Sequence, residues 1–236
     1  MLFGPEGARD TLCDDTWEWD GASWMRVGVT GPPARSESSA CFDPVRGRVV
    51  LFGGWRWVET GRVRLGDTWT FDGARWEQVS DSGPEARSGI ALAFDPRREA
   101  IVLVGGSAGR VPLADSWEWQ GSTWEGPFGG PGPRFNPSLA GDLRRGELVC
   151  FGGWDGSRRL GDTWLRRGRD WKPVAAASGP SPRNHSAMTF DDAHGNVLLF
   201  GGHDGERVFG DLWGWNGAGW VRLEDQEPLQ RADNGH

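Results

Sequence analysis

One arrangement of apolar and polar residues recurs along the whole chain. Apolar runs such as VVLFGG, IVLVGG, LVCFGG and VLLFGG end in a double glycine, and each is followed by a polar loop, an Asp-x-Trp element, a turn and a further Trp. The copies span residues 49–76, 101–124, 148–171 and 197–220, with a remnant at 2–24. The runs have the length of strands, and no segment shows the 3.6-residue period of an amphipathic helix. The pattern therefore predicts an all-β chain.

The spacing inside the repeat is regular. The Asp-x-Trp elements follow one another at intervals of 52, 48, 47 and 49 residues, and a second Trp lies seven residues after the first in every copy. An Arg also recurs in each repeat. It lies 16 residues before Leu51, Leu103, Cys150 and Leu199, each of which is two places ahead of a Gly-Gly. A period close to 50 residues is typical of the four-stranded blades of a β-propeller.

Each repeat predicts four short antiparallel strands. The first follows Gly-Pro and the Arg and contains small residues, which suit a crowded position near a central axis. The second is apolar on both faces, so we expect it to be buried between neighbouring sheets. Asp-Gly or Asn-Gly turns join the third and fourth strands. One copy differs, because Arg166-Arg167-Gly168 replaces the aromatic and polar pair found elsewhere.

These residues resemble the kelch-repeat family of β-propellers, the type found in the central domain of galactose oxidase. The resemblance rests on the Gly-Gly that closes the second strand, the Asp-x-Trp element and the Trp seven residues later, and it extends to about Leu223. It implies a propeller fold and leaves the function open. Galactose-oxidase-like enzymes use tyrosines in their copper-radical site, and this chain contains no Tyr. That redox chemistry is therefore excluded.

The two ends of the chain predict the number of blades. The N-terminus begins inside a second strand, and residues 228–234 resemble the start of a first strand. We expect five blades: four at 31–79, 83–125, 132–174 and 179–223, and a closing blade from residues 1–27 and 224–236. The alternative is that residues 224–236 are an acidic tail. A monomer is expected, with exchange of the split blade between two chains as the alternative.

Composition excludes several classes of partner. The net charge of −7 argues against a nucleic-acid backbone and against an anionic membrane surface. Mean hydropathy is −0.55 and no apolar run is long enough for a transmembrane helix. The first residues do not resemble a secretory signal, so a cytoplasmic location is expected. Thirteen of the 16 Trp lie in the predicted outer strands, which indicates that most of them serve packing.

An arginine set, defined by the repeated Arg, is the first group of candidate binding residues. It would lie on the propeller face that also carries the loops after each Gly-Gly. In one interpretation, each Arg pairs with a carboxylate or carbonyl of a neighbouring blade, the Asp of Asp-x-Trp being a candidate. In the other, the set binds an anionic ligand through forked donors. The set consists of Arg35, Arg87, Arg134, Arg183 and Arg231.

The residue two positions after each Arg varies between repeats, so this position is a candidate for specificity. It is occupied by Glu37, Gly89, Asn136, His185 and Asp233. Glu37, His185 and Asp233 are weak candidates for metal ligands or for an acid/base set at the channel mouth. No motif with metal-ligand spacing accompanies them, so neither a metal nor a cofactor is expected.

The loop after Gly53-Gly54 is the longest of its kind. It spans residues 55–66 and carries Trp55 and Trp57 beside three arginines, which suggests an exposed aromatic anchor for a partner. The alternative is that the two rings only cover the blade. Trp154 and His203 occupy the position that matches Trp55 in other repeats.

Two hypotheses about function follow, beside the possibility that the chain is a stand-alone scaffold or a fragment without small-molecule chemistry. In the first, the chain is a binding module that presents an Arg- and Trp-bearing face and the channel mouth to a peptide, a protein or an anionic small molecule. In the second, it is a non-redox enzyme, such as a lyase, isomerase, cyclase or hydrolase, that acts on a small molecule at the channel mouth.

Overall fold

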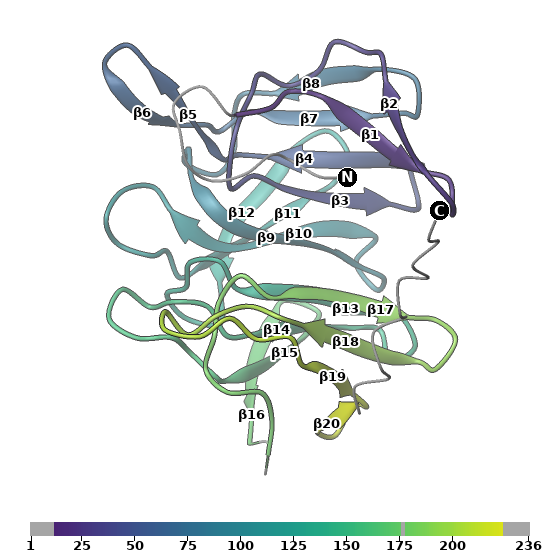
Figure 1. Ribbon diagram of the computed structural model, residues 1–236, viewed down its shortest axis with the longest axis vertical. Helices are drawn as coiled ribbons and strands as arrows, with labels where there is room; N and C mark the ends of the chain where they lie inside the picture. Colours follow the sequence, from purple (N-terminus) through teal and green to yellow (C-terminus); the bar gives the residue numbers. More distant parts are fainter. Residues whose placement is uncertain (1–11, 176–177, 224–236) are drawn as a thin grey trace, which may run out of the picture.

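The protein is all-β, as the repeat pattern predicts. The computed structural model describes residues 12–175 and 178–223, which form 20 strands and no helix. The strands make four four-stranded antiparallel sheets and two two-stranded hairpins (Figure 1). The described chain thus contains no helix that is long and apolar enough to cross a bilayer.

Each four-stranded sheet follows the order of the chain. Short turns join the first strand to the second and the third to the fourth, and a longer loop joins the second strand to the third. Sheet 1 consists of β3 (Ser39–Asp43), β4 (Arg48–Phe52), β7 (Thr68–Phe71) and β8 (Trp76–Ser80). Sheet 2 consists of β9 (Ser88–Asp95), β10 (Ala100–Ser107), β11 (Asp115–Trp119) and β12 (Trp124–Gly129). Sheet 3 consists of β13 (Ser138–Asp142), β14 (Glu147–Phe151), β15 (Thr163–Arg167) and β16 (Asp170–Val174). Sheet 4 consists of β17 (Ala187–Asp191), β18 (Asn196–Phe200), β19 (Leu212–Trp215) and β20 (Trp220–Leu223).

Two hairpins complete the described structure. The N-terminal hairpin, β1 (Thr16–Trp19) and β2 (Trp24–Val27), corresponds to the third and fourth strands of a repeat. The second hairpin, β5 (Trp55–Val58) and β6 (Gly61–Arg64), lies between β4 and β7. The long loop at residues 55–66 is therefore a pair of strands, which its two Trp and two Val favour.

The first strands of the four sheets lie side by side. β9 contacts both β3 and β13, and β13 contacts both β9 and β17 (Figure 1). The second strands, β4, β10 and β14, are buried between neighbouring sheets, as expected from their apolar character. In β10, for example, Ile101 and Leu103 pack toward sheet 1, whereas Val102 and Val104 pack toward sheet 3. Successive residues of a strand point to opposite faces, so one apolar run supplies two cores.

Tryptophans of the fourth strands join each sheet to the one before it. The indole N–H of Trp76 donates to the hydroxyl of Thr16 at 2.9 Å, that of Trp124 to Thr68 at 2.9 Å, and that of Trp220 to Thr163 at 2.8 Å. The ring fills the gap between sheets while its N–H is satisfied by the Thr of Asp-Thr-Trp. The Thr in these elements therefore carries an inter-sheet contact.

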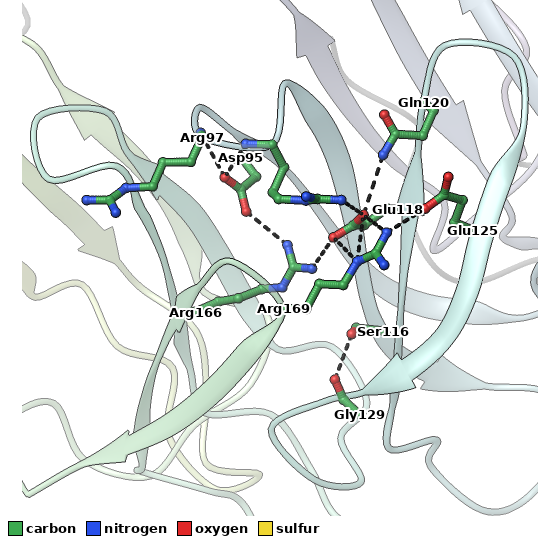
Figure 2. A network of polar contacts seen from close by, with 10 residues as sticks. Asp95, Arg97, Ser116, Glu118, Gln120, Glu125, Gly129, Arg166 and Arg169 are labelled. Carbon is green, nitrogen blue, oxygen red and sulfur yellow. Dashed lines mark hydrogen bonds and ion pairs between the residues drawn. The ribbon is translucent and has the colours of Figure 1, made fainter.

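The interface between sheets 2 and 3 contains an ion network that replaces this contact (Figure 2). Arg166, which occupies the position of Trp119 and Trp215, is fully buried and binds Asp95 at 2.9 Å and also Glu118. Arg98 and Arg169 reach the same Glu118 carboxylate at 3.1 and 2.9 Å. Here Trp171 finds no partner for its indole N–H among the described residues. Arg166 of the unusual Arg-Arg-Gly segment thus joins sheets 2 and 3 through buried ion pairs.

Burial would raise the pKa of the Glu118 carboxyl, but hydrogen bonds from Arg169, Arg98 and Arg166 outweigh it and lower the pKa to about 2. Glu118 is therefore ionised in the folded protein at neutral pH. Its charge is stable in the interior only because the three guanidinium groups surround it.

We expect Arg166→Met to destabilise the protein by about 3–5 kcal/mol, because it leaves buried Asp95 and Glu118 with one counter-ion fewer. Urea unfolding at pH 7 measures the change. Arg158→Met is the control, since the Arg158–Asp155 pair is exposed and such pairs contribute about 0–1 kcal/mol. Equal effects of the two substitutions would contradict the assignment.

Candidate functional site

The four described members of the arginine set are structural. Each side chain is at most 2% exposed and forms a fork with the Asp of Asp-x-Trp. In sheet 1, Arg35 donates to both carboxylate oxygens of Asp67 at 2.8 Å and to the carbonyl of Gly53 at 3.0 Å. The other forks are Arg87–Asp115, Arg134–Asp162 and Arg183–Asp211.

The geometry corrects one expectation about these forks. Each Arg pairs with the Asp of its own sheet, whereas a neighbouring blade was expected to supply the carboxylate. The main chain of the Arg makes the contact with the neighbour. Arg87 N–H donates to the Leu65 carbonyl at 3.1 Å, and the Arg87 carbonyl accepts from Gly54 N–H at 2.9 Å. The guanidinium groups are occupied and buried, so they do not face a ligand.

The close approach of the Arg main chain to the end of the second strand requires the Gly-Gly pair. A Cβ at Gly53 would lie 2.6 Å from the Arg87 carbonyl oxygen, and one at Gly105 would lie 2.4 Å from that of Arg134. Both glycines also have positive φ, at 71° and 64°. The motif therefore marks the place where the Arg of the next repeat crosses the end of the second strand.

The carboxylates of three forks are held ionised. Burial tends to raise the pKa of Asp67, Asp115 and Asp211, but hydrogen bonds from the paired Arg and from the Trp indole lower it below the ordinary value. Trp117, for instance, donates to Asp115 at 2.8 Å. The Asp-x-Trp spacing is thus explained by one carboxylate that serves both an Arg and a Trp.

The variable position after each Arg lies just ahead of the first strand of its sheet, and we call the row formed by Glu37, Gly89, Asn136 and His185 the mouth. Glu37, Gly89, Asn136 and His185 all have left-handed φ, between 48° and 66°. Their main chains form a continuous series: Gly89 N–H donates to Glu37 at 3.0 Å, Asn136 to Gly89 at 2.7 Å and His185 to Asn136 at 3.2 Å. The main chain thus fixes the positions while the side chains differ.

The side chains at this mouth fall into two groups. The first holds Glu37, whose Oε2 accepts from Arg62 at 3.0 Å and from Ser88 at 2.8 Å. The second holds His185, which contacts Asn136 Nδ2 at 2.6 Å and His203 Nε2 at 3.1 Å. The sequence offered no signal for Ser88, and Arg62 was noted only as one of the three arginines of the long loop. Asp233 and Arg231 lie outside the described residues.

The β5–β6 hairpin does not present an exposed Trp pair. Trp55 is buried at 8% exposure, and Trp57 packs edge-to-face on it at 5.6 Å between ring centroids. The Arg62 guanidinium covers the Trp55 ring at 3.8 Å and bridges to Glu37. Trp154 is half-buried and pairs with Phe135 and Arg159. The geometry therefore supports the alternative in which Trp55 and Trp57 only cover the sheet.

The loops after the Gly-Gly pairs contact one another in succession. We define the loop rim as residues 55–66, 107–114, 154–161 and 203–210. Arg64 donates to the Gly109 carbonyl at 2.7 Å, and Pro112 lies against Gly156. Arg159 lies against Gly205 in the same way. Each loop therefore rests on the preceding one.

The charge of the loop rim differs in sign from that of the chain. The rim contains seven arginines and four carboxylates, a net charge of +3, whereas the whole chain carries −7. Arg56, Arg110, Arg158 and Arg207 are exposed on it. Val111 and Val208 are also 71% and 88% exposed there. The rim therefore combines positive charge with apolar contact points.

Cysteine chemistry is not available in the buried part of the structure. Burial raises the pKa of the Cys41 thiol to about 12 and that of Cys150 to about 11. Both thiols stay protonated at neutral pH and are poor nucleophiles.

Comparison with known proteins adds no assignment: no protein-family model matches the chain, and no curated protein matches it at a significant level.

We expect Asp115→Asn to cost about 3–5 kcal/mol at pH 7, because it leaves buried Arg87 without its counter-ion. The pKa of Asp115 is lower in the folded state than its ordinary value of 3.8, so its contribution is present above that value and is lost as the pH falls below about 4. The difference in unfolding free energy between wild type and variant should therefore be constant above about pH 5 and shrink as the pH falls from about 4 through the lower pKa of the folded state.

Asp155→Asn provides the comparison in the same urea titrations. Asp155 accepts two main-chain N–H groups in an exposed turn, and the amide oxygen of Asn keeps that acceptor. A loss of stability as large as that of Asp115→Asn would contradict a special role for the buried fork.

Proposed function

We propose that the chain is a kelch-like, five-bladed β-propeller that acts as a binding module, with the loop rim as its binding surface. The adjacent first strands and the repeated inter-sheet contacts support a radial arrangement of the sheets. The positive charge of the rim, on a chain with a net charge of −7, is the observation that carries the binding function.

A fifth blade would be completed by residues 228–234 and the N-terminal hairpin. The Gly-Gly of sheet 4 is the first support. Gly201 has a positive φ of 70°, as Gly53 and Gly105 have, and a Cβ at either of those two would lie within 2.6 Å of the Arg carbonyl of the next repeat. An Arg231 main chain would fit there, with its N–H on the Phe209 carbonyl and its carbonyl on Gly202 N–H.

The N-terminal hairpin supplies the other half of the argument. Asp15 accepts the Trp17 indole N–H at 2.7 Å, as in every repeat. It also lines a hollow of about 520 Å³ beside Arg26 and Val27, where the guanidinium group of Arg231 would complete the fork. Trp24 is 44% exposed, in contrast to 7% for Trp76 and 4% for Trp220. Closure onto sheet 4 would cover it.

Closure is tested by Arg231→Ala, which we expect to cost about 3–5 kcal/mol, as for removal of a buried counter-ion. Arg222→Ala, on the exposed side of β20, is the matched control and should change stability by less than about 0.5 kcal/mol. Sedimentation at micromolar concentration should give one 25.9 kDa chain. A dimer with normal Arg231 dependence would indicate exchange of the split blade, and an Arg231 effect equal to the control would refute closure.

An acidic peptide or protein segment is the partner class that the rim favours. Exposed guanidinium groups recognise carboxylates through forked hydrogen bonds, and the valines between them offer contact to apolar side chains. The loop-to-loop contacts fix the main chains that carry these groups before binding, which lowers the entropic cost of association. An anionic small molecule would use the same groups over a smaller area.

The binding function is tested by selecting peptides from a displayed library on the wild-type protein. We expect acidic sequences with apolar residues, and we expect the double variant Arg110→Glu, Arg207→Glu to weaken their binding at least about tenfold, or 1.4 kcal/mol. Affinity should also fall with rising salt.

Arg75→Glu is the matched control, because Arg75 is exposed in the β7–β8 turn at the opposite end of sheet 1. It should leave the affinity unchanged. Neutral or basic selected peptides, or an equal effect of the control, would overturn the assignment of the rim.

The alternative, a non-redox enzyme at the channel mouth, is favoured by one observation. Asn136 lies within hydrogen-bonding distance of His185, and His185 lies within that distance of His203. Such a chain of side chains is able to hold and move a proton. Glu37 is bound to Arg62 and Ser88 in the other group. A reaction that is lost in His185→Gln and retained in Arg110→Glu would decide for this alternative.

A further inference from the structure

His185 and His203 lie beside each other at the mouth although 18 residues separate them in the chain. The Nδ1 atom of His185 is 3.1 Å from Nε2 of His203, and the two rings stack with centroids 5.0 Å apart. No local motif contains both residues, so sequence spacing alone gave no sign of this pair.

The backbone holds both rings in place. His185 has a left-handed φ of 58° and donates its N–H to the Asn136 carbonyl. His203 forms an antiparallel bridge with Asn184, with both main-chain hydrogen bonds at 3.1 Å. Because Asn184 directly precedes His185, the bridge brings the second imidazole next to the first. The pair is thus fixed by main-chain contacts on both sides.

The separation of the two nitrogens matches one edge of a metal coordination shell. Imidazole nitrogens bind zinc at about 2.0–2.1 Å, so two of them at angles between 90° and 109° are about 2.8–3.4 Å apart. The observed 3.1 Å lies within that range. His185 is exposed and His203 is partly exposed, so a hydrated ion can reach the pair.

Asn136 provides the outer contact that such a ligand needs. Its side-chain amide lies 2.6 Å from Nε2 of His185, the ring nitrogen that faces away from His203. With the amide turned by 180°, Oδ1 accepts from Nε2–H, and the lone pair of His185 is then on Nδ1. This is the arrangement by which hydrogen bonds to the second ring nitrogen orient metal-binding histidines.

We propose that His185 Nδ1 and His203 Nε2 chelate one divalent first-row transition metal ion, for which zinc is the probe. Imidazole is a favourable ligand for Zn²⁺, Cu²⁺ and Ni²⁺. The ion takes the place of the proton shared by the two nitrogens; that proton leaves Nε2 of His203, and Nδ1 of the same ring takes one up from solvent. Among the described residues no group of three or more His, Cys, Asp or Glu is placed to hold a metal. The site therefore has two protein ligands, and water fills the remaining positions.

The proposal does not depend on the partner of the loop rim. It is tested by titrating metal-free, tag-free protein with ZnCl₂ in a calorimeter. We expect one site per chain, and we expect His185→Gln and His203→Gln each to weaken it at least about tenfold. Asn136→Leu should weaken it by about tenfold through the lost outer contact, whereas Asn136→Asp should restore or tighten it.

His194→Gln is the matched control, because His194 is exposed in the β17–β18 turn and pairs with Asp191. It should keep wild-type affinity. Thermal unfolding without metal shows whether each variant is folded, and only folded variants are compared. Zinc binding that survives in both His185→Gln and His203→Gln, or no binding below millimolar zinc in the wild type, would overturn the site.

Discussion

The structure depends on a buried ion pair that is repeated in every sheet. A guanidinium group is expensive to bury, and each Arg of the set is accommodated because an Asp and a carbonyl of its own sheet satisfy its donors in a forked geometry. The main chain of the same Arg then bonds to the preceding sheet. One residue therefore orders its own sheet and locks that sheet to its neighbour. The Gly-Gly and Asp-x-Trp elements follow from it, since the first leaves room for the Arg carbonyl and the second supplies its carboxylate.

Much of this could be predicted from the chain alone. The repeat period and the doubly apolar runs such as VLLFGG predicted the all-β class and the burial of the second strands, because strand alternation makes burial on both faces readable. The choice between a structural and a ligand-binding Arg could not be made from spacing. It required the positions of Asp67 and its counterparts relative to the guanidinium groups. The sequence also did not show that each Arg pairs with the Asp of its own sheet. Equivalent Asp residues recur once per period, so spacing alone does not tell which copy lies beside a given Arg.

The candidate site was less predictable than the fold. The variable positions that face the mouth were found from the constant Arg, but their contacts come from residues with no positional signal, such as Ser88 on Glu37. The long loop was recognised as unusual, yet its Trp55 is covered by Arg62 and by its own hairpin. Arg166 was noticed as a departure from the repeat, and only the folded arrangement reveals that Asp95 and Glu118, from another sheet, balance its charge.

The left-handed backbone at the mouth has a consequence for how this protein can diverge. At positive φ a β-branched or bulky apolar side chain is strained, whereas Gly, Asn, Asp and His are tolerated. The positions of Glu37, Gly89, Asn136 and His185 therefore admit a restricted set of residues, most of them able to exchange protons or hydrogen bonds. We therefore expect a substitution at one of these positions to be tolerated more readily when it introduces a small or polar side chain than when it introduces a bulky apolar one. The backbone conformation at these four positions thus favours small or polar side chains, whatever residues the sheets themselves contain.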